Sequence, residues 1–245
     1  MQPKELKLLK TKKGRDETGL FIIEGEKFVQ EIPADWRVVK YVIAQRYAKT
    51  HGIPALRAGY EVMRDSIFDG LADTVSPQGV LAVCEQKRYL IEEIPRNFIL
   101  LGENLNDPGN IGALIRTAAA AGVSGVILTS GSGDIYNPKV LRASAGAVLR
   151  LPIVTDVSLT DVFEYLGDTP AYAAHPRGDV SPYELNLREN FCLMVGNEAK
   201  GLTDTAANLA RAKVSLPMVN STESLNASVA GSVLMYEAVR QRSCQ

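Results

Sequence analysis

Near its carboxyl end the sequence runs Val214-Ser-Leu-Pro-Met-Val-Asn-Ser-Thr-Glu-Ser-Leu-Asn-Ala-Ser-Val-Ala-Gly-Ser-Val-Leu-Met-Tyr-Glu-Ala-Val239. The short apolar run from Val214 to Leu216 predicts a buried strand, which Pro217 ends. Hydroxyl side chains suited to capping a helix follow, at Ser221, Thr222 and Ser224. The stretch therefore predicts a strand, a turn and a helix in close succession.

That helix has apolar residues at helical spacing, and the pattern predicts that they form a buried stripe: Leu225, Val229, Val233 and Tyr236. Other positions are small, so a neighbouring backbone can approach closely. Ser224 and Asn226 fall in the first turn, where unpaired N–H groups and the positive end of the helix dipole lie. Both an ordinary helix docked on a sheet and a helix whose first turn belongs to a site fit this pattern.

Composition allows one large or two modest domains, because the chain has 245 residues and is 46% hydrophobic. The formal net charge of −1 gives no global electrostatic argument for a nucleic-acid partner. Locally, the first fifteen residues carry a basic excess that can meet a phosphate backbone, contributed by Lys4, Lys7, Lys10, Lys12, Lys13 and Arg15. A solvated first helix with Leu6, Leu8 and Leu9 turned inward explains the same charges.

Cysteines and histidines are few and scattered. Cys84, Cys192 and Cys244 form no CxxC pair, and His51 and His175 are the only histidines. We therefore expect no structural zinc, no catalytic metal and no disulfide framework. No apolar run approaches the length of a membrane span, and no apolar segment follows the basic amino-terminal stretch. We expect a soluble, cytoplasmic protein that does not contact a membrane.

Two domains are predicted, at residues 1–92 and 97–245, with the boundary in the charged stretch before Asn97. The first alternates short helices and strands and includes a predicted helix from Tyr60 to Ile67. From Phe98 onward, strands that are almost continuously apolar alternate with helices, and one of these strands is predicted from Val148 to Val154. Such strands are typical of a parallel sheet covered by helices on both faces.

The first stretch that can carry chemistry is Gly102-Glu-Asn-Leu-Asn-Asp-Pro-Gly-Asn-Ile-Gly-Ala-Leu-Ile-Arg116. It follows a strand and opens a helix, which is where open α/β sheets usually bind ligands. Asn110 is placed to cap this helix. Its buried stripe is predicted to be Ile111, Leu114, Ile115 and Ala118. Arg116 lies off that stripe, and both a contact to a phosphate or substrate hydroxyl and an ordinary surface position fit it.

The second stretch is Leu193-Met-Val-Gly-Asn-Glu-Ala-Lys-Gly-Leu-Thr203. Gly196 and Gly201 have the spacing of a phosphate-binding loop, but Leu202 stands where that motif requires lysine, so a nucleoside triphosphate site is disfavoured. The turn instead offers backbone N–H groups with Asn197 and Glu198, which suit a neutral or zwitterionic cofactor. No GxGxxG follows a strand, and no Ser-His-Asp or Cys-His grouping is present.

Together the three stretches resemble, in order and spacing, the three motifs of the SpoU/TrmH branch of the SPOUT superfamily, the RNA 2′-O-ribose methyltransferases. The segment Asn104 to Ala118 resembles motif 1, and Val195 to Leu202 resembles motif 2. Motif 3 is resembled by Leu216-Pro-Met218 together with Ser224 to Ala230. Three ordered motifs are more specific than one.

This resemblance implies a carboxyl-terminal sheet with a deep trefoil knot, a homodimer formed through the knotted domain, and S-adenosylmethionine as cofactor. It implies that the adenine and ribose are held by Gly196, Leu216, Met218 and Leu225, beside Asn197 of the turn. It also implies that the catalytic site is lined by Asn110, Arg116, Glu198, Ser224 and Asn226. An arginine with a pKa above about 12 is a poor proton acceptor. Our hypothesis is that Arg116 binds an RNA phosphate or the developing alkoxide.

The front of the chain is similar to the substrate-binding domain that precedes many such catalytic domains. The similarity rests on Leu6 to Lys13 followed by Phe21-Ile-Ile-Glu-Gly25. It favours RNA contacts by Lys10, Lys12, Lys13 and Arg15. The segment Asn137 to Gly146 adds candidate phosphate contacts at Lys139, Arg142 and Ser144, although a plain capped helix explains this segment equally well.

The function that follows is methyl transfer from S-adenosylmethionine to a ribose 2′-hydroxyl of structured RNA. The two-domain layout favours large-subunit (23S) ribosomal RNA by analogy. Three alternatives stay open: a transfer-RNA 2′-O-methyltransferase, a non-catalytic RNA-binding or ribosome-assembly protein, and a small-molecule α/β enzyme. Binding of S-adenosylhomocysteine distinguishes the methyltransferases from the other two.

Overall fold

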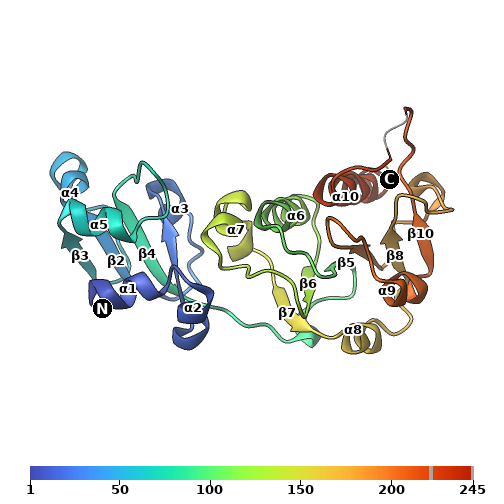
Figure 1. Cartoon of the computed structure of the whole chain (residues 1–245), viewed down its shortest axis with the longest axis horizontal. Helices are drawn as coiled ribbons and strands as arrows, with labels where there is room; N and C mark the ends of the chain where they lie inside the picture. Colours follow the sequence, from blue (N-terminus) through green and yellow to red (C-terminus); the bar gives the residue numbers. More distant parts are fainter. Residues whose placement is uncertain (221–222, 244–245) are drawn as a thin grey trace.

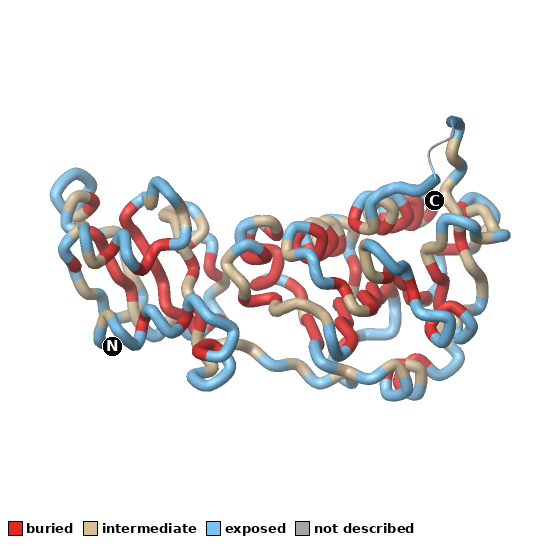
Figure 2. Tube along the Cα trace, in the orientation of Figure 1, coloured by how far each residue is buried: buried red, intermediate tan, exposed pale blue. Residues whose placement is uncertain are grey.

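A computed structural model describes residues 1–220 and 223–243. The molecule is elongated, with two lobes side by side along its long axis and an extended segment running from β4 to β5 (Figure 1). Buried segments lie in the sheets of both lobes (Figure 2). The capping positions Ser221 and Thr222, and Cys244, lie outside the described residues.

The first lobe is a four-stranded sheet in the order β1-β4-β2-β3, in which only β2 and β3 pair in parallel. Its elements are α1 (Pro3–Leu8), α2 (Lys12–Thr18), β1 (Leu20–Glu24), α3 (Glu26–Gln30), β2 (Val38–Ala44), α4 (Gln45–His51), β3 (Tyr60–Met63), α5 (Asp65–Leu71) and β4 (Val80–Glu85). The helix predicted from Tyr60 to Ile67 is therefore wrong. Its first half pairs with β2 as an edge strand, because tertiary pairing overrides the local pattern.

The second lobe is a six-stranded sheet in the order β10-β8-β9-β5-β6-β7, with every pair parallel. Its strands are β5 (Phe98–Gly102), β6 (Gly125–Thr129), β7 (Ile153–Val157), β8 (Ala171–Ala174), β9 (Phe191–Val195) and β10 (Ala212–Val214). The helices are η1 (Ile91–Glu93), α6 (Pro108–Ala120), α7 (Pro138–Ala143), η2 (Ala147–Leu149), α8 (Leu159–Leu166), η3 (Pro182–Glu184), α9 (Asp204–Leu209) and α10 (Ala227–Ser243).

Alternation along the strands divides the core of this lobe into two layers. Leu100 and Leu193 face a cluster that includes α6, α7 and α10, whereas Leu101 and Met194 face α8 and α9. Successive strand residues point to opposite faces, so both faces of the sheet are covered by helices. The predicted α/β fold with a parallel sheet is confirmed, and the trefoil knot stays a prediction.

Caps set where the helices around the site begin. The Asp107 carboxylate accepts the Asn110 N–H at 2.8 Å, and Pro108 occupies the first helical position of α6. Asn137 with Pro138 does the same for α7. The cap of α6 is therefore Asp107, and not Asn110 as the sequence suggested, which leaves the Asn110 side chain available for other contacts.

Two further sequence predictions need correction. The predicted strand Val148 to Val154 is the 3₁₀ turn η2 followed by β7, because its first half covers α6 instead of pairing. The stripe predicted to be buried on α10 is exposed, with Val229 at 47%, Val233 at 43% and Tyr236 at 52%. The face that packs on the lobe carries Gly231, Leu234, Met235 and Ala238.

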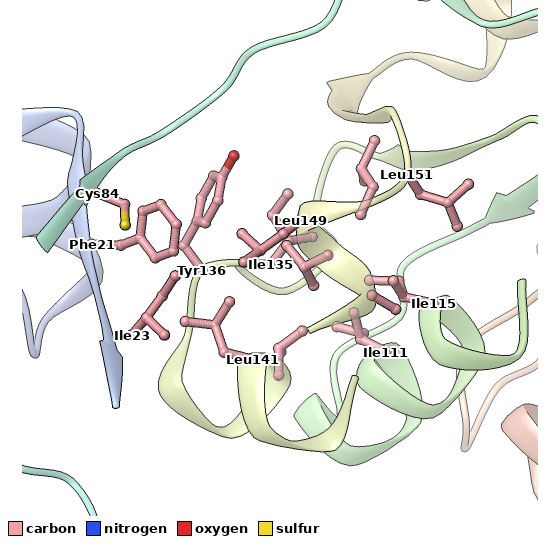
Figure 3. Close-up of a cluster of buried hydrophobic side chains, with 14 of the residues drawn as sticks. Phe21, Ile23, Cys84, Ile111, Ile115, Ile135, Tyr136, Leu141, Leu149 and Leu151 are labelled. Carbon is pink, nitrogen blue, oxygen red and sulfur yellow. The ribbon is translucent and has the colours of Figure 1, made fainter. Parts of the chain in front are cut away.

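The two lobes share a continuous apolar cluster where β1 meets α7 and η2 (Figure 3). Phe21 lies 4.5 Å from Tyr136, ring centroid to centroid, and the Trp36 indole N–H donates to the Leu149 carbonyl at 2.8 Å. Beside them the buried Arg15 guanidinium pairs with Asp134 at 2.5 Å. The lobes therefore pack as one body, while the division into domains at residues 92 and 97 stays a prediction.

Candidate functional site

The loops of motifs 1 and 2 meet because their strands are neighbours. β5 and β9 pair in parallel with Gly102 opposite Val195, and the two loops leave these strands at the same edge of the sheet. The chain order also reverses here, since β6 and β7 lie on one side of β5 and β9, β8 and β10 on the other. Open α/β sheets bind ligands at such a switch point.

Side chains of motif 2 fasten the two loops together. The Asn197 amide donates to the Asn104 carbonyl at 2.9 Å, and its oxygen accepts the Ala199 and Lys200 N–H groups. The Glu198 carboxylate accepts the Asp107 N–H at 3.1 Å. Glu198 therefore holds the amino-terminal end of α6, where a negative charge is also favoured by the helix dipole.

Gly196 allows motif 2 to fold back on itself. The Asn197 and Gly201 backbones exchange hydrogen bonds of 3.0 and 2.8 Å. A Cβ atom on Gly196 would lie 2.2 Å from the Gly201 carbonyl carbon and from the Leu202 nitrogen. Glycine is required here because a backbone passes where a side chain would stand.

The first turns of α6 and α10 are joined by amide side chains. Asn226 donates to the Asn110 oxygen at 3.0 Å, and its own oxygen accepts the Ser228 N–H at 2.8 Å, so Asn226 also caps α10. The Ser228 hydroxyl lies 2.7 Å from the Asn226 oxygen and 3.1 Å from the Asn110 oxygen. The structure thus brings Asn110 and Asn226, both predicted as catalytic, into direct contact.

A cavity of about 300 Å³ opens between motif 2, motif 3 and the loop after β8. It is lined by every residue predicted to hold the cofactor, namely Gly196, Asn197, Leu216, Met218 and Leu225, and by Glu198 and Ser224. The volume falls at the lower end of the range of ligand pockets. Five residues predicted to hold one ligand therefore line one cavity.

The lining fits a cofactor with an apolar part and a zwitterionic part. Ala227, Ala230 and Gly196 leave room, and Leu216 and Leu234 give an apolar wall. Glu198, Glu223, Arg177 and Lys200 supply both signs of charge at the rim. Such a mixture suits a molecule that carries an aromatic base, a carboxylate and positive charges.

Arg116 lies elsewhere. It is exposed on α6 and lines a second cavity, of about 770 Å³, between the lobes. It lies six positions after Asn110, or about 9 Å along a helix. Of the five residues predicted as catalytic, the structure therefore gathers Asn110, Glu198, Ser224 and Asn226 around the motif loops and places Arg116 apart from them.

The residues predicted to contact RNA differ in their exposure and in their partners. Arg15 is 2% exposed and Ser144 is fully buried, where its hydroxyl donates to the Leu141 carbonyl, so neither faces solvent. Their predicted RNA contacts are corrected to packing roles. Lys12 pairs with Asp16, and Lys10 donates to the Ala72 carbonyl. The basic excess of the amino terminus is thus partly neutralised within the first lobe.

On the second lobe, Lys139 is exposed. Arg142 reaches across to Asp73 at 2.6 Å.

Sequence reasoning missed three residues at the site. Ser228 completes the amide cluster, and the buried Glu103 carboxylate accepts the Thr203 N–H and hydroxyl at 2.8 and 2.7 Å. Asn104 adopts a positive φ of 51° so that its carbonyl can accept from Asn197. Only the position of Asn104 directly before the motif 1 turn was a usable signal, since asparagine tolerates this conformation.

The family comparison decides the identity of this arrangement. Residues 97–236 match the model of the SpoU rRNA Methylase family, and residues 2–82 match the MRM3-like substrate binding domain. The chain belongs to the SpoU rRNA methylase family. The family predicted from the three motifs is confirmed, and with it the prediction of a methyltransferase.

Curated and solved relatives agree with this assignment. A 23S rRNA (guanosine(2553)-2′-O)-methyltransferase of Bacillus subtilis is 32% identical, over 95% of this chain and 94% of its own length. The SpoU methyltransferase AviRb of Streptomyces viridochromogenes, solved with the cofactor AdoMet, matches with a TM-score of 0.86, 27% identity and coverage of 99% of this chain and 98% of its own.

A solved structure whose description names 2-OH methylation of C/U34 on tRNA is 31% identical to this chain. The match covers 62% of this chain and all of the other chain, with a TM-score of 0.56.

Among the described residues, no group of histidine, cysteine and acidic side chains is placed to bind a metal ion. None of the described helices has the length and apolar character needed to cross a bilayer.

Proposed function

We propose that this SpoU family member transfers a methyl group from S-adenosylmethionine to a ribose 2′-hydroxyl of 23S ribosomal RNA in the cytoplasm. The observation that carries the proposal is the cavity lined by motifs 2 and 3 beside the Asn110–Asn226 contact. The Bacillus subtilis relative, which covers 95% of this chain, is named for 23S rRNA, whereas the match to the tRNA structure covers 62% of this chain.

The chain's own contribution is positioning. S-adenosylmethionine supplies an already activated methyl group, so the protein must align it with the acceptor oxygen and stabilise the charge that develops there. Asn110 and Asn226 are in direct contact at the first turns of α6 and α10, and Glu198 holds the loop that precedes α6. We assign these three residues and Ser224 to alignment of the ribose.

The exposed apolar face of α10 supports a homodimer. Val229, Val233 and Tyr236 lie four and three residues apart and are about half exposed, which is unusual for such side chains on a carboxyl-terminal helix that packs on a sheet. A second copy of the same chain is the occupant we propose, because an isologous contact places one such face against another.

Two experiments test the proposal. Calorimetry with S-adenosylhomocysteine should show binding, and its absence would reject any methyltransferase activity for this chain. Transfer of radiolabelled methyl groups to unmodified 23S rRNA, with a transfer-RNA pool as the competing substrate, should label the ribosomal RNA alone. Labelling of the transfer RNA instead would favour that alternative, and binding of RNA without any transfer would favour an assembly protein.

A further inference from the structure

The cavity between the lobes has no part in the proposed chemistry. Its volume is about 770 Å³. It is lined on one side by α3 and on the other by α6, α7 and η2, so both lobes contribute to it. Its charged side chains are Lys27, Arg116, Arg142 and Arg150, against the carboxylates Glu24 and Glu31.

The positive charges of this cavity are only partly compensated. Glu31 forms ion pairs with two cations, with Arg150 at 3.1 Å and with Lys27 at 3.9 Å. Lys27 keeps 88% of its side chain exposed and Arg150 keeps 50%. Arg116 has no hydrogen bond or ion pair within residues 1–220 and 223–243. Solvent-facing cations with shared or absent partners are suited to binding phosphate groups.

An aromatic ring lies among these cations. Phe28 is half-buried in the wall of the cavity, where it faces Gly146 at the turn before η2. A Cβ atom added to Gly146 would lie 3.1 Å from the Phe28 ring and 3.6 Å from the Arg150 guanidinium. Cations combined with an exposed aromatic face are the usual means of holding unpaired nucleotides.

We infer that the cavity between α3 and α6 holds a single-stranded segment of the substrate RNA. Lys27, Arg116 and Arg150 bind its phosphates and Phe28 stacks on one of its bases. This inference rests on the proposed function. α6 links the two sites, because its first turn carries Asn110 and its later turns line the cavity. The RNA next to the methylated ribose would thus be held by both lobes at once.

The test compares two double variants in binding to an unmodified 23S rRNA transcript at several salt concentrations. Lys27→Ala with Arg150→Ala removes one lysine of the first lobe and one arginine of the second from the cavity. The control pair, Lys49→Ala with Arg211→Ala, also removes one lysine of the first lobe and one arginine of the second, but both lie outside the cavity. The cavity pair should weaken binding about tenfold and lower the salt slope by about 1.4, the value for two phosphate contacts to single-stranded RNA.

A third variant separates stacking from charge. Phe28→Leu keeps an apolar side chain against Gly146, and it should weaken RNA binding about tenfold without changing the salt slope. All variants should bind S-adenosylhomocysteine as the wild type does, which verifies the fold.

Wild-type RNA affinity in the cavity pair, or equal losses in both pairs, would overturn the inference. Because binding is measured without transfer, a wild type that binds RNA and transfers no methyl group rejects only the proposed function.

Discussion

At the scale of single residues, the contact between Asn110 and Asn226 has two roles. It joins the helices that carry motifs 1 and 3, and the same Asn226 oxygen caps α10. Ser232 and Thr117 join the same two helices further along, with 2.9 Å between their hydroxyl oxygens. The two polar links differ in that only the first lies beside the cavity lined by motifs 2 and 3.

Asn226→Ala should therefore reduce methyl transfer about 100-fold, because a small misplacement of aligned groups has effects of this size. The lost cap should lower the free energy of unfolding by about 1 kcal/mol. Ser232→Ala is the matched control and should keep activity within about twofold. Equal losses of activity in both variants would show that the link acts only by joining the helices.

Arg116→Lys keeps a positive charge and removes the planar guanidinium, which can bind a phosphate with two hydrogen bonds. If Arg116 binds phosphate, the KM for RNA should rise about tenfold while kcat and cofactor affinity stay near wild-type values. Steady-state kinetics across pH 6–9 measure both constants. A fall in kcat with an unchanged KM would place Arg116 at the reacting atoms instead.

Burial makes two cysteines unreactive. Desolvation raises the pKa of Cys84 and of Cys192 to about 12, so the reactive thiolate is scarce at neutral pH. In a Cys244→Ser variant, a thiol reagent at pH 8 should label the folded protein hardly at all and should label both cysteines in denaturant. Rapid labelling of the folded protein would show that one of these strands opens.

At the scale of elements, Gly196 and Gly231 differ in which atoms an added side chain would meet. On Gly196 a Cβ atom would meet backbone atoms at 2.2 Å, whereas on Gly231 it would meet the end of the Leu114 side chain at 2.7 Å. A backbone cannot move aside without opening the motif 2 turn, while a leucine side chain can rotate.

Gly196→Ala should consequently abolish S-adenosylhomocysteine binding in calorimetry. Gly231→Ala should bind within about threefold of wild type, because it only shifts the packing between α10 and α6. Normal binding by Gly196→Ala would mean that the motif 2 turn does not form the cofactor cavity.

The exposed stripe on α10 gives a prediction for assembly. Val233→Asp places a charge in the proposed dimer contact and should shift the protein from dimer to monomer in light scattering. Leu90→Asp introduces the same charge at a residue that is 69% exposed in the extended segment between the lobes, and it should leave the dimer intact. A wild type that is monomeric would reject the homodimer.

At the scale of the whole molecule, the lobes are joined by a buried ion pair within an apolar cluster. Arg15 Nε and Nη2 both donate to one Asp134 oxygen, at 2.8 and 2.5 Å, and the other Asp134 oxygen accepts the Tyr136 N–H. Since the cluster runs from β1 through Tyr136 to α6, neither lobe completes its core alone. The predicted result in calorimetry is a single unfolding transition.

Asp134→Ala leaves the Arg15 guanidinium buried without its anionic partner, and should lower the free energy of unfolding by about 3–5 kcal/mol. Arg15→Met combined with Asp134→Leu removes both charges and should recover much of that loss. Thermal unfolding of the three proteins measures both effects. Two separate transitions in the wild type would contradict the rigid joint.

The sequence by itself determined the family, the parallel sheet, the buried stripe of α6 and a group of residues that line the cavity between motifs 2 and 3. These follow from local signals: apolar strands, capping residues and three ordered motifs. The motif residues directly follow the ends of strands, and the fold brings these strand ends to one edge of the sheet. For this reason Gly196, Leu216 and Leu225 could be assigned to one cavity before their positions were known.

Only the tertiary structure decided which charges and which apolar residues face outward. The sequence cannot show that Arg15 is buried against Asp134, because its partner lies 119 positions away. Nor can helical spacing separate the two faces of α10, because an apolar stripe looks the same whether it packs on its own lobe or on a partner. Burial depends on what covers a residue, and contacts between distant segments decide that.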